Sequence, residues 1–92
     1  MEYREMVKRI PRTMRGALSE KLMDCLLETK EGSNVPASLA KTILYYWQRD
    51  RLDTQAGLTN LLHATAIADP EKTAKIMYDM GLEEISIALR QA

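Results

Sequence analysis

The 92-residue chain has one cysteine, one histidine and no phenylalanine. Cys25 has no second cysteine with which to form an internal disulfide, and Cys25 and His63 together are too few ligands for a cysteine–histidine metal site. A lone thiol is typical of proteins from a reducing compartment, so we expect a cytoplasmic location. The scarcity of these residues gives no reason to expect a metal or another cofactor.

Long apolar runs are also missing from the sequence. No stretch approaches the ~18 apolar residues that a bilayer-spanning helix needs, and residues 1–10 lack the apolar core of a signal peptide. We therefore expect no membrane association. Since 46% of the residues are hydrophobic and 28% are charged, the composition predicts a single globular domain over residues 1–92.

The sequence lacks the short motifs that support catalysis. It has no glycine-rich phosphate loop and no nucleophile elbow, and no serine or cysteine lies beside an evident base. Glu83 and Glu84 are neighbours, so their side chains diverge on a helix and do not form a paired acid and base. We therefore expect a protein that works by binding and is not an enzyme.

The formal net charge is zero, with 13 basic and 13 acidic residues, but the charges are segregated. Residues 1–21 hold six basic and three acidic side chains, whereas residues 53–92 hold three basic and six acidic ones. This balance excludes a protein that coats nucleic acid by bulk charge. If a helix continued through Pro11, one of its faces would carry a basic strip able to hold phosphates without sequence preference, formed by Arg4, Lys8, Arg12 and Arg15. The alternatives are a solvated face and a docking strip for an acidic partner.

Apolar residues recur with the 3.6-residue period of a helix, and no segment alternates as a strand does. Asp69-Pro70 predicts a capped helix start, and Gly32 and Gly81 suit the left-handed residue after a helix. We predict an all-α single-domain bundle of five or six short helices, orthogonal or antiparallel. The predicted helices span residues 12–31, 36–50, 54–68, 70–80 and 82–91, with a short separate helix or an arm in residues 1–10.

The predicted helix over residues 12–31 is apolar on two sides, because Met23 and Leu27 point away from its main stripe. Such a helix is either the middle of the bundle or a face that forms a homodimer. Exposure of Met23 and Leu27 together with Ile87 would create an apolar patch that calls for a partner.

Residues 76–90 invite comparison with a DNA-binding helix-turn-helix motif, because Gly81 stands at the turn position. Met77 is large where that motif needs a small residue, and Glu83 and Glu84 would face the phosphates of the DNA. A plain helical hairpin is therefore predicted for this segment.

Tyr45, Tyr46 and Trp47 are consecutive, and successive residues are ~100° apart around a helix. On a helical wheel, Tyr45 lies nearly opposite the predicted core side, which consists of Leu39, Ala40, Ile43, Leu44 and Trp47. We predict that Tyr45 is exposed between Lys41 and Arg49 and that these three residues bind a protein partner. The alternatives are that the ring stacks on an unpaired base or packs on neighbouring side chains.

The remaining candidates have plain structural interpretations. His63 is predicted on the outer side of its helix, away from the apolar stripe. Cys25 lies on a core stripe and is predicted to be a small buried hydrophobe.

Taken together, these features predict a non-catalytic helical interaction module. It would be a small accessory or adaptor subunit of a larger intracellular complex, such as one for DNA replication or repair. The alternative is a weak, sequence-tolerant nucleic-acid-binding protein that combines the basic N-terminal residues with Tyr45.

Overall fold

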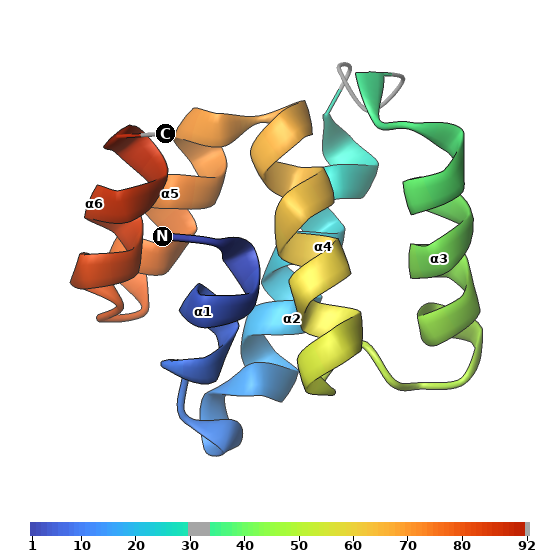
Figure 1. Ribbon diagram of the computed structural model, residues 1–92, viewed down its shortest axis with the longest axis horizontal. Helices are drawn as coiled ribbons and strands as arrows, with labels where there is room; N and C mark the ends of the chain where they lie inside the picture. The colour runs from blue at the N-terminus through green and yellow to red at the C-terminus, as the bar shows by residue number, and fades with distance from the viewer. Residues whose placement is uncertain (30–33, 92) are drawn as a thin grey trace.

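The computed structural model describes residues 1–29 and 34–91, which form six α-helices and no strand (Figure 1). The predicted all-α bundle is confirmed, including the short separate helix before Pro11. The helices are α1 (Tyr3–Lys8), α2 (Arg12–Glu28), α3 (Ala37–Gln48), α4 (Gln55–Ala68), α5 (Pro70–Asp79) and α6 (Glu83–Gln91). The helix predicted for residues 12–31 ends earlier, at Glu28, because Thr29 is extended; Gly32 lies outside the described residues. Within the described ranges, every helix is too short or too polar to cross a bilayer.

Local capping fixes where α4 and α5 begin. The side chain of Thr54 accepts a hydrogen bond from the Gly57 N–H at 3.1 Å. Asp69 accepts one in the same way from the Lys72 N–H at 3.1 Å, and Pro70 is the first helical residue of α5. These caps satisfy N–H groups that have no partner within the helix. The Asp69 cap is the signal that located the start of α5 in the sequence, whereas the start of α4 was placed from its apolar spacing.

The segment α5–α6 is a helical hairpin, as predicted. Gly81 ends α5 with φ 79°, and the Leu82 N–H donates to the Met77 carbonyl at 2.9 Å, the hydrogen bond of a Schellman motif. The buried Ser86 hydroxyl donates to the Ala74 carbonyl at 2.7 Å and joins the two helices.

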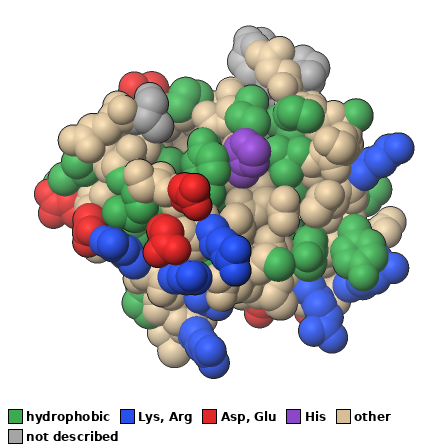
Figure 2. All heavy atoms as spheres, in the orientation of Figure 1, with side chains coloured by type: hydrophobic (Ala, Val, Ile, Leu, Met, Phe, Trp, Pro, Cys, Tyr) green, Lys and Arg blue, Asp and Glu red, His purple; other side chains and the backbone are tan. Residues whose placement is uncertain are grey.

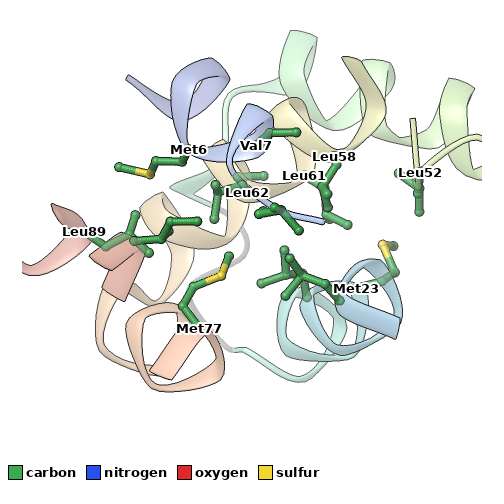
Figure 3. Close-up of a cluster of buried hydrophobic side chains, with 14 of the residues drawn as sticks. Met6, Val7, Met23, Leu52, Leu58, Leu61, Leu62, Met77 and Leu89 are labelled. Atoms are coloured by element: carbon green, nitrogen blue, oxygen red, sulfur yellow. The ribbon is translucent and has the colours of Figure 1, made fainter. Parts of the chain in front are cut away.

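Helix α4 occupies the middle of the bundle and packs against α1, α2, α3 and α5 (Figure 1). The two-sided apolar pattern made residues 12–31 a candidate for this place, but α2 packs mainly against α4 and α5, whereas α4 has four such neighbours. Figure 3 shows leucines of α4 meeting side chains from α1 and α5. The buried residues of α4 are Gly57, Leu58, Leu61, Leu62, Ala64, Thr65 and Ala68.

Helix α3 lies at the edge of the bundle, where it packs against α4. It buries Ile43, and Leu39 and Tyr46 are half-buried against the core. The prediction that Ala40, Leu44 and Trp47 face the core is wrong, because Leu44 is 46% exposed, Trp47 is 48% exposed and Ala40 is also exposed. The helical wheel averaged over all apolar residues, whereas the inward direction is set by the one helix against which α3 packs.

The chain leaves α3 through an unusual helix end. The Asp50 N–H donates to the Trp47 carbonyl at 3.1 Å, and the Arg51 N–H donates to the Tyr46 carbonyl at 2.8 Å. These are the two hydrogen bonds of a Schellman motif, in which the left-handed residue is usually glycine. Here that residue is Asp50, with φ 54°. Aspartate is among the few residues that tolerate this conformation.

The connection between α3 and α4 lies directly against the start of α4. A Cβ atom on Gly57 would be 2.2 Å from the carbonyl oxygen of Arg51 and 3.0 Å from the Cα atom of Leu52. Only glycine permits this approach of two backbone segments. Gly57 therefore fixes the position of residues 51–52 relative to α4.

Candidate functional site

An open groove lies between α2 and α3 and consists of two adjoining hollows that share Met23 and Trp47. We call it the α2–α3 groove. The first hollow has a volume of about 390 Å³ and is lined by Gly16, Ser19, Glu20, Met23, Asp24, Leu27, Trp47, Asp50, Leu52 and Asp53. The second has a volume of about 290 Å³ and is lined by Met23, Leu26, Val35, Ala40, Ile43, Leu44 and Trp47.

The first hollow is acidic. Four carboxylates line it, and its lining contains neither lysine nor arginine. We call the four acidic residues the acidic rim: Glu20, Asp24, Asp50 and Asp53. Within the described residues, the ion pairs all join other side chains. Arg49 follows α3 beside Asp50 but is turned back over the Tyr45 ring. The rim therefore presents negative charge without an ion-pair partner in the described part of the chain.

The second hollow is apolar along its whole lining. Trp47 separates it from the acidic hollow and is half-exposed, as is Leu44 beside it. Across the groove, Leu27 is 62% exposed, whereas Met23 is nearly buried and points to the side of α2 on which Leu52 lies (Figure 3). The apolar patch that exposure of Met23, Leu27 and Ile87 would have created is not formed, because Met23 is buried and Ile87, exposed on α6, does not line the groove.

The residues of the acidic rim were not singled out in the sequence, although a signal for two of them was present. Glu20, Met23, Asp24 and Leu27 are spaced i, i+3, i+4 and i+7 on α2, which places them on one helix face. A mixed acidic and apolar stripe at this spacing indicates a surface that is neither core nor ordinary solvated face. Asp50 and Asp53 join them only through the fold, because they lie in the connection after α3.

Tyr45 is 52% exposed, as predicted from its place on the helix. The Arg49 guanidinium carbon lies 3.7 Å from the centroid of the Tyr45 ring, and its Nη1 donates to the Tyr45 carbonyl at 3.1 Å. Tyr46 meets the same ring edge to face, with centroids 5.4 Å apart. Lys41 is exposed one turn earlier. Figure 2 shows hydrophobic and basic side chains exposed together over α3.

The basic N-terminal residues do not share one helix face, because α1 ends at Lys8 and α2 starts at Arg12 after Pro11. Arg4 and Arg12 are exposed. Arg15 is half-buried and donates to the Val7 carbonyl at 3.3 Å, and Lys8 pairs with Glu5 at 3.4 Å. Figure 2 shows acidic side chains close to the basic ones in the region of α1. The continuous phosphate-binding strip that required an unbroken helix is therefore not formed.

Cys25 and His63 occupy the places that the sequence predicted. Cys25 is buried, and burial raises the pKa of its thiol more than the nearby Lys72 ammonium lowers it. The thiol is therefore protonated at neutral pH, whereas a nucleophilic cysteine needs the thiolate form. His63 is exposed and stacks on the Tyr3 ring, with centroids 4.8 Å apart.

Buried hydroxyl groups have structural roles in this molecule. Ser19, Thr65 and Thr73 each donate to a backbone carbonyl of their own helix or its cap. Among the residues that the structure describes, no three histidine, cysteine, aspartate or glutamate side chains converge on a position for a metal ion. Comparisons with protein-family models, curated proteins and solved structures give no match to this chain.

Proposed function

We propose that this protein is a non-catalytic helical interaction module that binds a partner protein through α3 and the α2–α3 groove. The observation that carries the proposal is the exposure of three large side chains of α3, Leu44, Tyr45 and Trp47, each about half exposed. Leu44 and Trp47 line the open groove. Exposed apolar side chains gathered at a groove of a small domain mark an interaction site.

The chemistry of this surface supports a protein partner. Tyrosine, tryptophan and arginine are the residues most enriched among those that dominate binding energy at protein interfaces. Arg49 lies against Tyr45 and holds its ring in place, so less side-chain freedom is lost when a partner packs on it. The outer part of the proposed surface consists of Tyr45, Lys41 and Arg49. Its inner part consists of Leu44 and Trp47, which line the groove.

The proposal includes a role as a small accessory or adaptor subunit in the cytoplasm, because the chain offers a binding surface and a single buried thiol. An assembly for DNA replication or repair is one such setting. A homodimer is the competing occupant of the same surface, and sedimentation of the purified protein distinguishes the two.

Photocrosslinking tests this function directly. Photoreactive benzoylphenylalanine replaces Tyr45 in one variant and Tyr78 in a second, where Tyr78 is the matched control because it is 60% exposed on α5. We expect irradiation in the native cell to yield a specific adduct from position 45 only. The purified partner must then bind the wild-type protein. Equal adducts from both positions, or none from position 45, contradict the proposal.

Nucleic acid is the alternative ligand, and it has weaker support. The basic residues are divided between two helices, and one face of Tyr45 is covered by Arg49, leaving less of the ring for a base. We expect no binding of single-stranded or duplex oligonucleotides in a fluorescence anisotropy titration at low salt. Binding with a steep salt dependence would establish the alternative.

A further inference from the structure

We infer that the segment that fills the α2–α3 groove is a cationic amphipathic helix of the partner, with an apolar face and lysine or arginine side chains at one end. This inference rests on the proposed function and adds the chemistry of the partner to it. It is carried by the division of the groove into an acidic hollow and an apolar hollow on either side of Trp47.

The negative charge of the acidic hollow favours a positively charged partner. Its four carboxylates come from two directions, Glu20 and Asp24 from α2 and Asp50 and Asp53 from the α3–α4 connection. In the described part of the chain none of them is in an ion pair. Complementary charge attracts and orients a partner, whereas like charge brought to the same place is rejected. Lysine and arginine side chains therefore suit this hollow, while nucleic acid and anionic lipid do not.

The described basic side chains that are adjacent in sequence to rim residues leave the acidic rim open. Arg49 is held on Tyr45, and neither Arg51 nor Lys21 lines the groove although each is next to a rim residue in sequence. Among residues 1–29 and 34–91 no basic side chain pairs with the rim, which leaves its negative charge available to a basic partner.

The apolar hollow selects a large apolar side chain. Its lining contains Leu26 from α2, Val35 from before α3, and Ile43 with the half-exposed Leu44 and Trp47 from α3. Burying a leucine-sized side chain against such a surface contributes binding free energy that the charges alone do not supply. Because Trp47 borders both hollows, the apolar and basic groups of the partner must be neighbours on one of its faces.

A helix satisfies this requirement better than an extended strand. A strand binds by adding to an exposed sheet edge, and the described residues form helices only. An amphipathic helix binds by laying its apolar face in a groove, as the hollows between α2 and α3 allow. A second folded copy of this chain that docks through its basic N-terminal residues fits poorly, because Met6, Val7 and Ile10, the apolar side chains near those residues, are buried.

Two helical model peptides of equal length and apolar content test the inference. One carries leucine with lysine, and the other carries leucine with glutamate. Trp47 is the only tryptophan, so its fluorescence reports binding at the groove, and isothermal titration calorimetry gives the affinity independently. We expect a saturable change in Trp47 emission with the lysine peptide and at least about tenfold weaker binding of the glutamate peptide.

Two variants that each lose two negative charges distinguish binding at the acidic rim from a general electrostatic attraction between the protein and the lysine peptide. Glu20→Gln with Asp24→Asn removes two rim charges, and Glu2→Gln with Glu83→Gln removes two exposed charges elsewhere. We expect the first pair of substitutions to weaken binding of the lysine peptide by about twofold to thirtyfold, the combined effect of two exposed charge pairs, and the second pair to leave the affinity unchanged. Leu44→Gln tests the apolar hollow, and we expect at least about fivefold weaker binding by calorimetry.

The outcomes that overturn the inference differ from those that overturn the proposed function. Equal binding of the two peptides, or equal losses in the two charge variants, rejects a cationic helix while a Tyr45 adduct still supports an interaction module. A dimer in sedimentation that Leu44→Gln dissociates would assign the groove to a second copy. If position 45 gives no adduct but the lysine peptide still binds preferentially, the proposed function is rejected. The inferred preference of the groove for a cationic helix is then still supported.

Discussion

Helices α3 and α4 are neighbours of similar length, but they use their apolar side chains differently. α4 packs against four helices and buries seven residues, whereas α3 packs against one helix and buries only Ile43. The aromatic residues are concentrated in the less buried helix. The comparison shows that the number of neighbouring helices, and not the apolar content of a segment, decides how much of it becomes core.

The largest expected effect contrasts one leucine from each helix. Leu61 is fully buried in α4, and we expect Leu61→Ala to lower the free energy of unfolding by about 2–5 kcal/mol, because it leaves a cavity. Leu44 is half-exposed on α3, and we expect Leu44→Ala to cost less than about 1 kcal/mol, because little buried surface is lost. Urea denaturation measures both. Similar losses would mean that the two helices are equally buried, and the comparison would fail.

Two glycine variants examine the contact that joins the α3–α4 connection to α4. We expect Gly57→Ala to cost about 1–3 kcal/mol, because its new methyl group meets the Arg51 carbonyl and forces the backbone to move. Gly16→Ala is the control in α2, where a Cβ has no atom within 4 Å. We expect it to add about 0.5–1 kcal/mol, since alanine favours a helix interior. Thermal denaturation measures the two changes in the free energy of unfolding, which we expect to have opposite signs. If Gly57→Ala stabilised the protein, the close approach of residues 51–52 to α4 would be contradicted.

The pH dependence of stability tests whether the Cys25 thiol is buried inside the bundle. Burial raises the pKa of the thiol above its ordinary value of 9.0, so the folded chain favours the protonated form. The stability gained from this difference is complete below about pH 9 and is lost as the pH rises through the folded-state pKa. We expect the free energy of unfolding to fall with pH above 9, and to fall less in Cys25→Ala. Equal pH dependence in the two proteins would show that the thiol is not desolvated.

The smallest expected effect on stability is at Tyr45. We expect Tyr45→Ala to change the free energy of unfolding by no more than about 0.5 kcal/mol, because the ring is exposed, while partner capture is lost. Tyr46→Ala is the adjacent control and should cost more, because Tyr46 packs against the core. Circular dichroism during thermal unfolding measures both. Marked destabilisation by Tyr45→Ala would place that ring in the core.

Much of the fold was predictable because its signals are local. Asp69-Pro70 and Gly81 marked helix ends through capping and the left-handed conformation, and both appear where predicted. The position of Trp47 was not predictable in this way. Its burial depends on whether α2 closes against α3, and a helical wheel contains no information about the neighbours of a helix.

The candidate site was predictable in its outer part only. The exposure of Tyr45 was predicted from its position on the helix relative to the apolar residues. That prediction is confirmed although Leu44 and Trp47, which were predicted to face the core, are also exposed. The acidic rim depends on Asp50 and Asp53 meeting α2, a contact between segments far apart in sequence. The single helix face of Arg4, Lys8, Arg12 and Arg15 required a helix that continues through Pro11, and the chain instead forms two helices, one on each side of that proline.

The missing side chain at Gly57 has a consequence for binding as well as for stability. By holding residues 51–52 against α4, it settles the backbone between Asp50 and Asp53 during folding, before any ligand arrives. If the partner proposed above binds between α2 and α3, we expect this wall of the groove to need little rearrangement, so that less conformational entropy is lost on binding.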